Sequence, residues 1–115
     1  MIHTIIVEDD PMVAKIHRQY LERLGGFSID GIFNDGTKAL DYLEKHTNDL
    51  IILDIYMPRM TGLQLLHKLR AIDVKSSVIM VTAAMETKII GDALELGIID
   101  YLIKPFSYER FREAI

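Results

Sequence analysis

The sequence has 115 residues, of which 50% are hydrophobic and 26% charged, and its formal net charge is -4. This length suits one compact domain, and the absence of cysteine excludes a disulfide framework and a thiolate zinc site. The acidic balance disfavours nucleic-acid binding by this segment itself, and no apolar run approaches the length of a membrane span. Because the N-terminus also lacks a signal-peptide pattern, we expect a cytoplasmic protein.

Short apolar runs rich in Ile and Val recur along the chain and predict β-strands. The third and fourth runs are apolar along their length, as expected for strands that are buried on both faces of a sheet. The predicted strands are His3–Val7, Phe27–Phe33, Leu50–Leu53, Ser77–Val81 and Asp100–Ile103.

Segments with helical spacing of apolar residues separate these runs. The first helix is predicted to begin at Pro11, after a capping Asp10, and to end at Gly25. Its predicted apolar stripe comprises Val13, Ile16, Tyr20 and Leu24. Four further helices are predicted at about Thr37–His46 with Asp35 as its cap, after Gly62, up to Gly97, and from Ser107 to Ile115.

Strict alternation of five strands with helices predicts an α/β fold with a parallel sheet covered on both faces. Right-handed crossovers leave few topologies, and we expect a flavodoxin-like, doubly wound (βα)5 domain with strand order 2-1-3-4-5. In such sheets ligands bind at the carboxyl ends of the strands, near the point where the strand order reverses.

Chemically active side chains follow four of the predicted strands. Glu8 and Asp9 follow the first, Asp54 the third, Thr82 the fourth and Lys104 the fifth. Three carboxylates facing one lysine repel each other, and a divalent cation would cancel two of their charges. Hard oxygen ligands with room for water favour Mg²⁺. The nucleophile would be the carboxylate of the third strand, which can form an aspartyl phosphate by a transfer that needs mainly positioning and charge neutralisation.

Each of these residues taken alone has a simpler interpretation. An acid after a strand is usually a turn former or helix cap, as we expect for Asp10 before Pro11. A threonine there is usually a local hydrogen-bonding residue, and a lysine is usually solvated. The joint pattern at successive strand ends is what favours a site. The four histidines show no metal-ligand spacing and are expected at the surface or partly buried: His3, His17, His46 and His67.

Four segments give the sequence a resemblance to a known family. In order, they are IVEDD at 6–10, LDIYMP at 53–58 with Gly62 following, VTA at 81–83, and YLIKPF at 101–106. Together, at these separations, they are highly specific. The chain resembles, along its whole length, the CheY-like receiver domain of bacterial two-component response regulators. This resemblance also implies the flavodoxin-like fold.

The resemblance implies a role for each matched acid. Asp54 would be the phosphoacceptor, Asp9 the direct metal ligand, and Glu8 its partner through water. The backbone carbonyl of Tyr56 would complete the protein's share of the Mg²⁺ shell.

The remaining matched residues would form the switch. Thr82 would close on the phosphoryl group, Lys104 would pair with it, and the bond from Lys104 to Pro105 would be cis. Tyr101 matches the aromatic side chain that swings inward as the threonine moves. Tyr56 and Ala84 stand where the family varies and line the path of the attacking water, so bulky Tyr56 is expected to slow self-dephosphorylation.

The resemblance also implies partners. A sensor histidine kinase would donate the phosphoryl group, and the domain would catalyse its own phosphotransfer and dephosphorylation without being an enzyme for another substrate. The surface of the fourth helix, fifth strand and fifth helix would then be repacked, with homodimerisation as one outcome. The segments around Asp54 and at 100–106 are similar to regulators answering citrate and C4-dicarboxylate sensors. Residues 1–115 would then be the receiver, with a helix-turn-helix DNA-binding domain beyond Ile115.

Three other functions remain open from the residues alone. A phosphatase of the haloacid-dehalogenase type needs a second acid two residues after its nucleophile, where this chain has Tyr56. A nucleotide- or flavin-binding module would want a glycine-rich loop after the first strand, where residues 8–11 are acidic. An unphosphorylated scaffold is disfavoured by the full acidic set and would be supported by a lack of phosphorylation.

Overall fold

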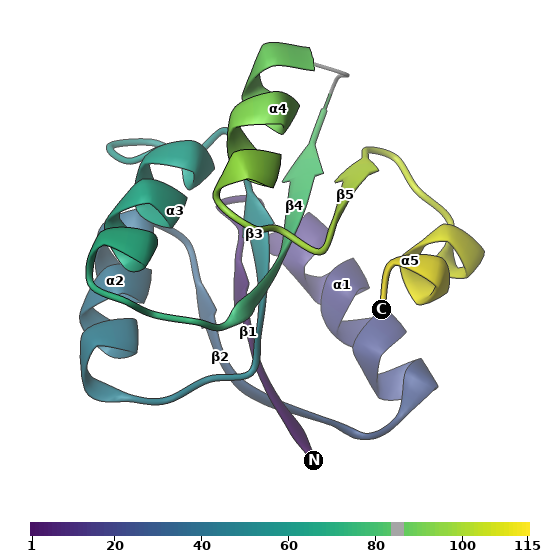
Figure 1. Cartoon of the computed structure of the whole chain (residues 1–115). Coiled ribbons are helices and arrows are strands. Elements are labelled where there is room, and N and C mark those ends of the chain that lie inside the picture. Colours follow the sequence, from purple (N-terminus) through teal and green to yellow (C-terminus); the bar gives the residue numbers. More distant parts are fainter. Residues whose placement is uncertain (84–86) are drawn as a thin grey trace.

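The computed structural model describes residues 1–83 and 87–115 (Figure 1). Strands and helices alternate along these residues in the order β1 (Ile2–Val7), α1 (Pro11–Leu24), β2 (Phe27–Phe33), α2 (Gly36–Lys45), β3 (Leu50–Asp54), α3 (Gly62–Ala71), β4 (Ser77–Thr82), α4 (Thr87–Glu95), β5 (Asp100–Ile103) and α5 (Tyr108–Ala114). The sheet has the order β2-β1-β3-β4-β5 and every neighbouring pair is parallel. The predicted flavodoxin-like topology is therefore confirmed.

The sheet is the middle of three layers. Helices α2, α3 and α4 cover one face and α1 and α5 cover the other (Figure 1). All residues of β3 are buried, as are all of β4 except Ser77, which confirms that these strands are buried on both faces. Alternate residues of the central strands, such as Ile51 and Ile52, contribute to separate apolar clusters on the two faces.

Local capping explains where several helices begin. The Asp10 carboxylate accepts a hydrogen bond from the Met12 amide, and Asp35 accepts one from the Lys38 amide, which confirms both predicted caps. Thr61 and Gln64 form a reciprocal capping box at the start of α3. These caps place the helix starts at the carboxyl edge of the sheet, beside the strand ends.

The first helix is rotated relative to the predicted stripe. Ile16 is 39% exposed, whereas Ala14, His17 and Leu21 are buried. Apolar residues occupy more than one side of this helix, so packing against α5 and the loop before it selects the buried face. His17 stacks on Phe106 of that loop, with ring centroids 5.2 Å apart, and on Phe111 of α5 at 6.4 Å. The prediction that His17 lies at the surface or only partly buried was wrong.

Strand β1 begins one residue earlier than predicted, and two other strands extend one residue further at their carboxyl ends. Asp54 is the last residue of β3 and Thr82 is the last of β4, so both are held by the sheet and do not belong to the loops that follow. Ala84, named above for the path of water, lies outside the described residues.

Candidate functional site at the carboxyl edge of the sheet

The strand register brings the predicted site residues to one edge of the sheet. Val7 pairs with Leu53, so Glu8 lies beside the end of β3. Asp54 pairs with Val81, one residue before Thr82. Because parallel strands end at the same edge, residues far apart in sequence become neighbours there.

An acid cluster forms at this edge from Glu8, Asp9 and Asp54. Each of the three offers a carboxylate oxygen, and these atoms lie within 4.8 Å of one another. Glu8 and Asp54 are only 2% and 5% exposed, whereas Asp9 is exposed. The cluster therefore has two buried members and one that faces solvent, from which an ion can enter.

Lys104 is the countercharge of the acid cluster. Its Nζ lies 2.7 Å from Glu8 Oε1 and 3.3 Å from Asp54 Oδ1. The Lys104 amide donates to the Thr82 carbonyl at 2.7 Å, which ties the end of β5 to the end of β4. Burial alone would lower the pKa of Lys104, but the two carboxylates outweigh burial and raise it, so the ammonium stays charged.

Burial raises the pKa values of the two buried acids, whereas an ordinary salt bridge would lower them. Burial raises the pKa of Glu8 to about 7, against the lowering effect of Lys104, and the nearby Asp54 charge adds to the rise. Burial likewise raises the pKa of Asp54, again opposed by Lys104. One lysine is therefore too little positive charge for this cluster, and a bound cation would favour its fully ionised form.

The donor set fits a hard divalent cation such as Mg²⁺. All three groups are carboxylates, which Mg²⁺ prefers, and one is open to water, which this ion retains. Glu8 Oε1 is buried and lies 2.7 Å from Lys104 Nζ, so this oxygen is already paired with the ammonium. The three carboxylates outnumber Lys104, so the cluster keeps a net negative charge that a divalent cation would offset.

Gly62 allows α3 to begin directly against the end of β3. A Cβ on Gly62 would overlap the Asp54 carbonyl oxygen and lie 2.9 Å from Ile55 Cα. The Gly62 amide donates to the Ile55 carbonyl at 2.7 Å, which closes the loop after Asp54. The sequence matched this glycine to a family motif but did not reveal the close approach that requires it.

The other predicted site residues lie in two places. Thr82 is fully buried at the end of β4, and Tyr56 lies in the loop after Asp54 with 47% of its surface exposed. Tyr101 is half-buried on β5 against the apolar cluster beneath α2, α3 and α4, and Arg110 donates to its carbonyl at 2.9 Å. The Lys104–Pro105 bond is cis, in agreement with the resemblance.

Sequence reasoning missed one polar contact beside the cluster. Arg59, in the loop after β3, forms an ion pair with the buried carboxylate of Asp35, 24 residues away. Nothing local in the sequence signals this pairing, because it depends on two loops meeting at the same edge.

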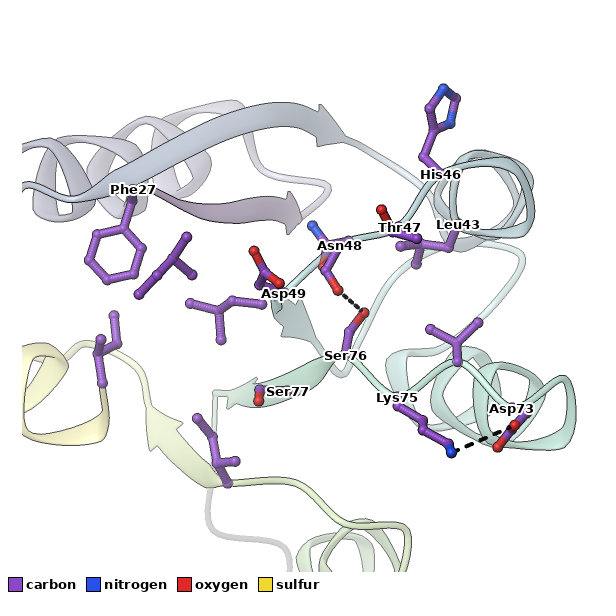
Figure 2. Close-up of a pocket in the computed structure, with 15 residues that line it drawn as sticks. Phe27, Leu43, His46, Thr47, Asn48, Asp49, Asp73, Lys75, Ser76 and Ser77 are labelled. Carbon is purple, nitrogen blue, oxygen red and sulfur yellow. Dashed lines mark hydrogen bonds and ion pairs between the residues drawn. The ribbon is translucent and has the colours of Figure 1, made fainter.

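A hollow of about 900 Å³ lies at the other end of the sheet (Figure 2). It is lined by Asp49 and Leu50 at the start of β3, by Ser76 and Ser77 at the start of β4, and by Phe27. Its labelled polar groups are already engaged in part: the Ser76 hydroxyl donates to the Asn48 carbonyl at 2.7 Å. The described metal-binding geometry is at the opposite edge, so this hollow is separate from the acid cluster.

None of the helices described is both long enough and apolar enough to cross a membrane.

Comparisons with known proteins agree with this geometry. Residues 4–115 match the family described as response regulator receiver domain. The chain is 48% identical over 115 residues to the transcriptional regulatory protein MalR of Bacillus subtilis, covering 100% of the chain and 49% of MalR. It is 38% identical over 111 residues to a protein of Priestia megaterium named probable C4-dicarboxylate response regulator DctR, covering 96% and 49%.

A solved structure is also similar over nearly its whole length. The DNA-binding response regulator of the LuxR family from Staphylococcus aureus has a TM-score of 0.90 at 30% identity, covering 99% of this chain and 95% of that chain. The present chain spans about half the length of the curated relatives it matches.

Proposed function

The chain belongs to the response regulator receiver family, and we propose that it is a signalling switch that accepts a phosphoryl group on Asp54. The observation that carries the proposal is the acid cluster held against Lys104 at the carboxyl edge of the sheet. Asp54 is fixed by β3, and the register and Gly62 leave its backbone little freedom.

In the proposed reaction an Asp54 carboxylate oxygen attacks the phosphorus of the donor. The bond from phosphorus to the donor's leaving atom breaks, and its electron pair departs with the donor, which leaves an aspartyl phosphate. Lys104 balances the charge of the phosphoryl oxygens, and the Thr82 hydroxyl donates a hydrogen bond to one of them. The donor would be the phosphohistidine of a sensor kinase. The domain would assist its own phosphorylation and dephosphorylation, and would act on no other substrate.

Glu8, Asp9 and Asp54, with the carbonyl of Tyr56, would hold Mg²⁺. When bound, the cation supplies positive charge opposite the phosphoryl oxygens and offsets the repulsion between the acids. The structural support for this set is that the three acids each offer a carboxylate oxygen within 4.8 Å of the others, with one lysine as their countercharge.

The output would pass through Tyr101. An aspartyl phosphate adds about two negative charges, and we propose that Thr82 moves toward it while Tyr101 turns inward. Arg110 supports a link to α5. Its guanidinium donates to the Tyr101 carbonyl at 2.9 Å and to the two Asp100 carboxylate oxygens at 3.2 Å and 3.1 Å. The repacked α4-β5-α5 surface would be read by a partner or by a second copy in a homodimer.

The whole protein would be a transcriptional regulator. The relatives named above are about twice as long as this chain, and one carries C4-dicarboxylate in its name. We propose that DNA is bound by a further domain, and that the cognate kinase answers a small carboxylate such as a C4-dicarboxylate or citrate.

The test is intact mass after incubation with acetyl phosphate, with and without Mg²⁺, for wild type, Asp54→Asn and Asp49→Asn. Asp49 precedes β3 at the opposite edge of the sheet, so its variant removes the same charge away from the cluster. We expect one phosphoryl adduct that requires Mg²⁺, is absent from Asp54→Asn and persists in Asp49→Asn.

Two results would contradict the proposal. No adduct on folded wild type under any condition would favour the scaffold function. An adduct that persists in Asp54→Asn would show that another residue is the acceptor.

A further inference from the structure

The Asp35 carboxylate has hydrogen-bond partners from two different parts of the chain. Its Oδ1 accepts the Lys38 amide at 3.0 Å, which caps α2. Its Oδ2 accepts from Arg59 Nε at 3.2 Å and Nη2 at 2.7 Å, so the guanidinium grips one oxygen with two donors. The Lys38 amide and then Arg59 lower the pKa of Asp35, so the carboxylate is ionised at neutral pH.

The pair joins α2 to the loop that follows Asp54. Arg59 lies in the loop between β3 and α3, three residues after Tyr56, whereas Asp35 is the N-cap residue of α2. The next residue adds a second contact, because a Cβ on Gly36 would lie 3.1 Å from the Met60 Cβ and Sδ. The loop is therefore held against the start of α2 by a polar contact at residue 59 and by close packing at residue 60.

The backbone conformation at Arg59 is one that favours glycine. Its φ is +68°, in the left-handed region that glycine enters freely and side-chain-bearing residues enter at an energetic penalty. The Arg59 side chain is 70% exposed, so burial of its stem does little to offset that penalty. The interaction that offsets this backbone penalty is the pair of hydrogen bonds from the Arg59 guanidinium to the buried Asp35 carboxylate.

We propose that Asp35 and Arg59 form a positioning clamp that holds the acceptor loop in its metal-binding conformation. The clamp rests on the proposed function, because the group it positions is the Tyr56 carbonyl assigned above to Mg²⁺. Neither residue touches the reacting atoms. Their effect is to reduce the number of conformations that the loop visits, so that less order must be created when the cation binds.

Charge and positioning predict opposite effects for one substitution. Arg59→Gln removes a positive charge from the edge that carries the acid cluster, and electrostatics alone would make Mg²⁺ bind more tightly. Loss of the clamp would make Mg²⁺ bind more weakly, because the loop would have to be ordered on binding. The sign of the change in Mg²⁺ dissociation constant therefore separates the two.

The experiment is a calorimetric Mg²⁺ titration of wild type, Arg59→Gln and Arg112→Gln. Arg112 is an exposed residue of α5, so its variant is a control with the same change in net charge. We expect a dissociation constant about tenfold weaker in Arg59→Gln, comparable with loss of a group that orients a metal ligand. Arg112→Gln should stay at the wild-type value.

A second substitution tests the pair from its other side. Asp35→Asn keeps a side chain that can cap α2 but removes the ionic partner of Arg59. If the two residues act as one clamp, Asp35→Asn combined with Arg59→Gln should bind Mg²⁺ no more weakly than the worse single variant. Additive losses in the double variant would overturn the clamp.

Two further measurements separate positioning from general destabilisation. In metal-free protein, amide hydrogen exchange at residues 55–61 should rise in Arg59→Gln while the central strands keep wild-type protection. Phosphorylation by acetyl phosphate should slow at low Mg²⁺ and recover at saturating Mg²⁺. Failure of saturating Mg²⁺ to restore the rate would overturn a purely positioning role.

The outcome for wild type keeps the two proposals distinct. If wild type binds Mg²⁺ and Arg59→Gln binds it equally or more tightly, the clamp is wrong and the proposed function stands. If folded wild type binds no Mg²⁺, both are wrong.

Discussion

Two of the regions that bury titratable side chains do so with opposite consequences. The acid cluster buries Glu8 and Asp54 beside Lys104 at the carboxyl edge of the sheet. The second region is an aromatic cluster between α1 and α5, formed by His17, Tyr20, Phe106 and Phe111.

The difference lies in the partners that each region supplies. Burial raises the pKa of Glu8 to about 7, yet a lysine ammonium lies 2.7 Å away and exposed Asp9 opens the cluster to solvent. In the aromatic cluster burial, assisted by the positive charge of Lys104, lowers the pKa of His17 to about 4. Its Nδ1 has no hydrogen-bond partner among the described residues, so the ring is neutral at physiological pH. The acid cluster therefore combines burial with a countercharge and an opening to solvent, whereas His17 is buried by packing among aromatic rings.

The two regions also change the free energy of unfolding in opposite directions as the pH changes. His17 has a folded pKa below its unfolded value of 6.5, so its stabilising contribution is complete above pH 6.5 and is lost as pH falls toward 4. Glu8 has a folded pKa above its unfolded value of 4.5, so its contribution is complete below pH 4.5 and is lost as pH rises through about 7. The wild-type profile between these values is a sum of opposing terms.

The largest expected effect is the pH dependence of the unfolding free energy that comes from His17. His17→Phe keeps a ring in the cluster but cannot be protonated, so it should escape the loss that wild type suffers on acidification. Between pH 8 and pH 5, wild type should lose about 2 kcal/mol of unfolding free energy relative to the variant. Urea denaturation across this range measures the difference, and His67→Phe, at an exposed position of α3, is the control. Parallel pH profiles for wild type and His17→Phe would show that His17 titrates normally.

The second effect tests the acid cluster in the absence of divalent cations. In EDTA at pH 7, Asp54→Asn should be about 1–2 kcal/mol more stable than wild type, because it removes one buried charge from a cluster with a single lysine. Added Mg²⁺ should stabilise wild type by about 1.4 kcal/mol for each tenfold excess over its dissociation constant and should stabilise the variant less. Thermal and urea unfolding with and without Mg²⁺ measure both changes. A variant that is less stable in EDTA would mean that Lys104 already neutralises the cluster.

The smallest effect concerns the polar group at the rim of the aromatic cluster. The Tyr20 hydroxyl donates to the Phe106 carbonyl at 3.4 Å, which is a long hydrogen bond. Tyr20→Phe should therefore lower the unfolding free energy by about 0.5 kcal/mol or less. Tyr42→Phe, on the other side of the sheet, is the matched control and should show no change. A loss well above this in Tyr20→Phe would mean that the hydroxyl helps to hold the loop after Lys104.

Much of the fold and the core of the site could be predicted from local patterns. The apolar runs located all five strands to within one residue at each end, and Asp10 and Asp35 were identified as helix caps. Because parallel strands end at one edge, the residues following those runs were expected together, and the structure brings Glu8, Asp54 and Lys104 within ion-pair distance. The chemical roles assigned to these residues and to Tyr101 remain predictions.

The misses share a physical cause. The burial of His17 and the exposure of Ile16 depend on how α1 rotates against α5, and a helix with apolar residues on several sides does not specify that rotation. The pairing of Asp35 with Arg59 depends on contact between two loops, because the two residues are 24 positions apart in the sequence.

By itself, the sequence determined which segments are strands, which are helices and which side chains stand at the strand ends, because periodicity and capping are local properties of the chain. Only the tertiary structure decided how far those side chains are buried and which of them lie within reach of Lys104. It also decided that the loop after β3 contacts the start of α2 through Arg59 and Asp35. Burial and ion pairing depend on distances between segments, and those distances exist only once the sheet has assembled.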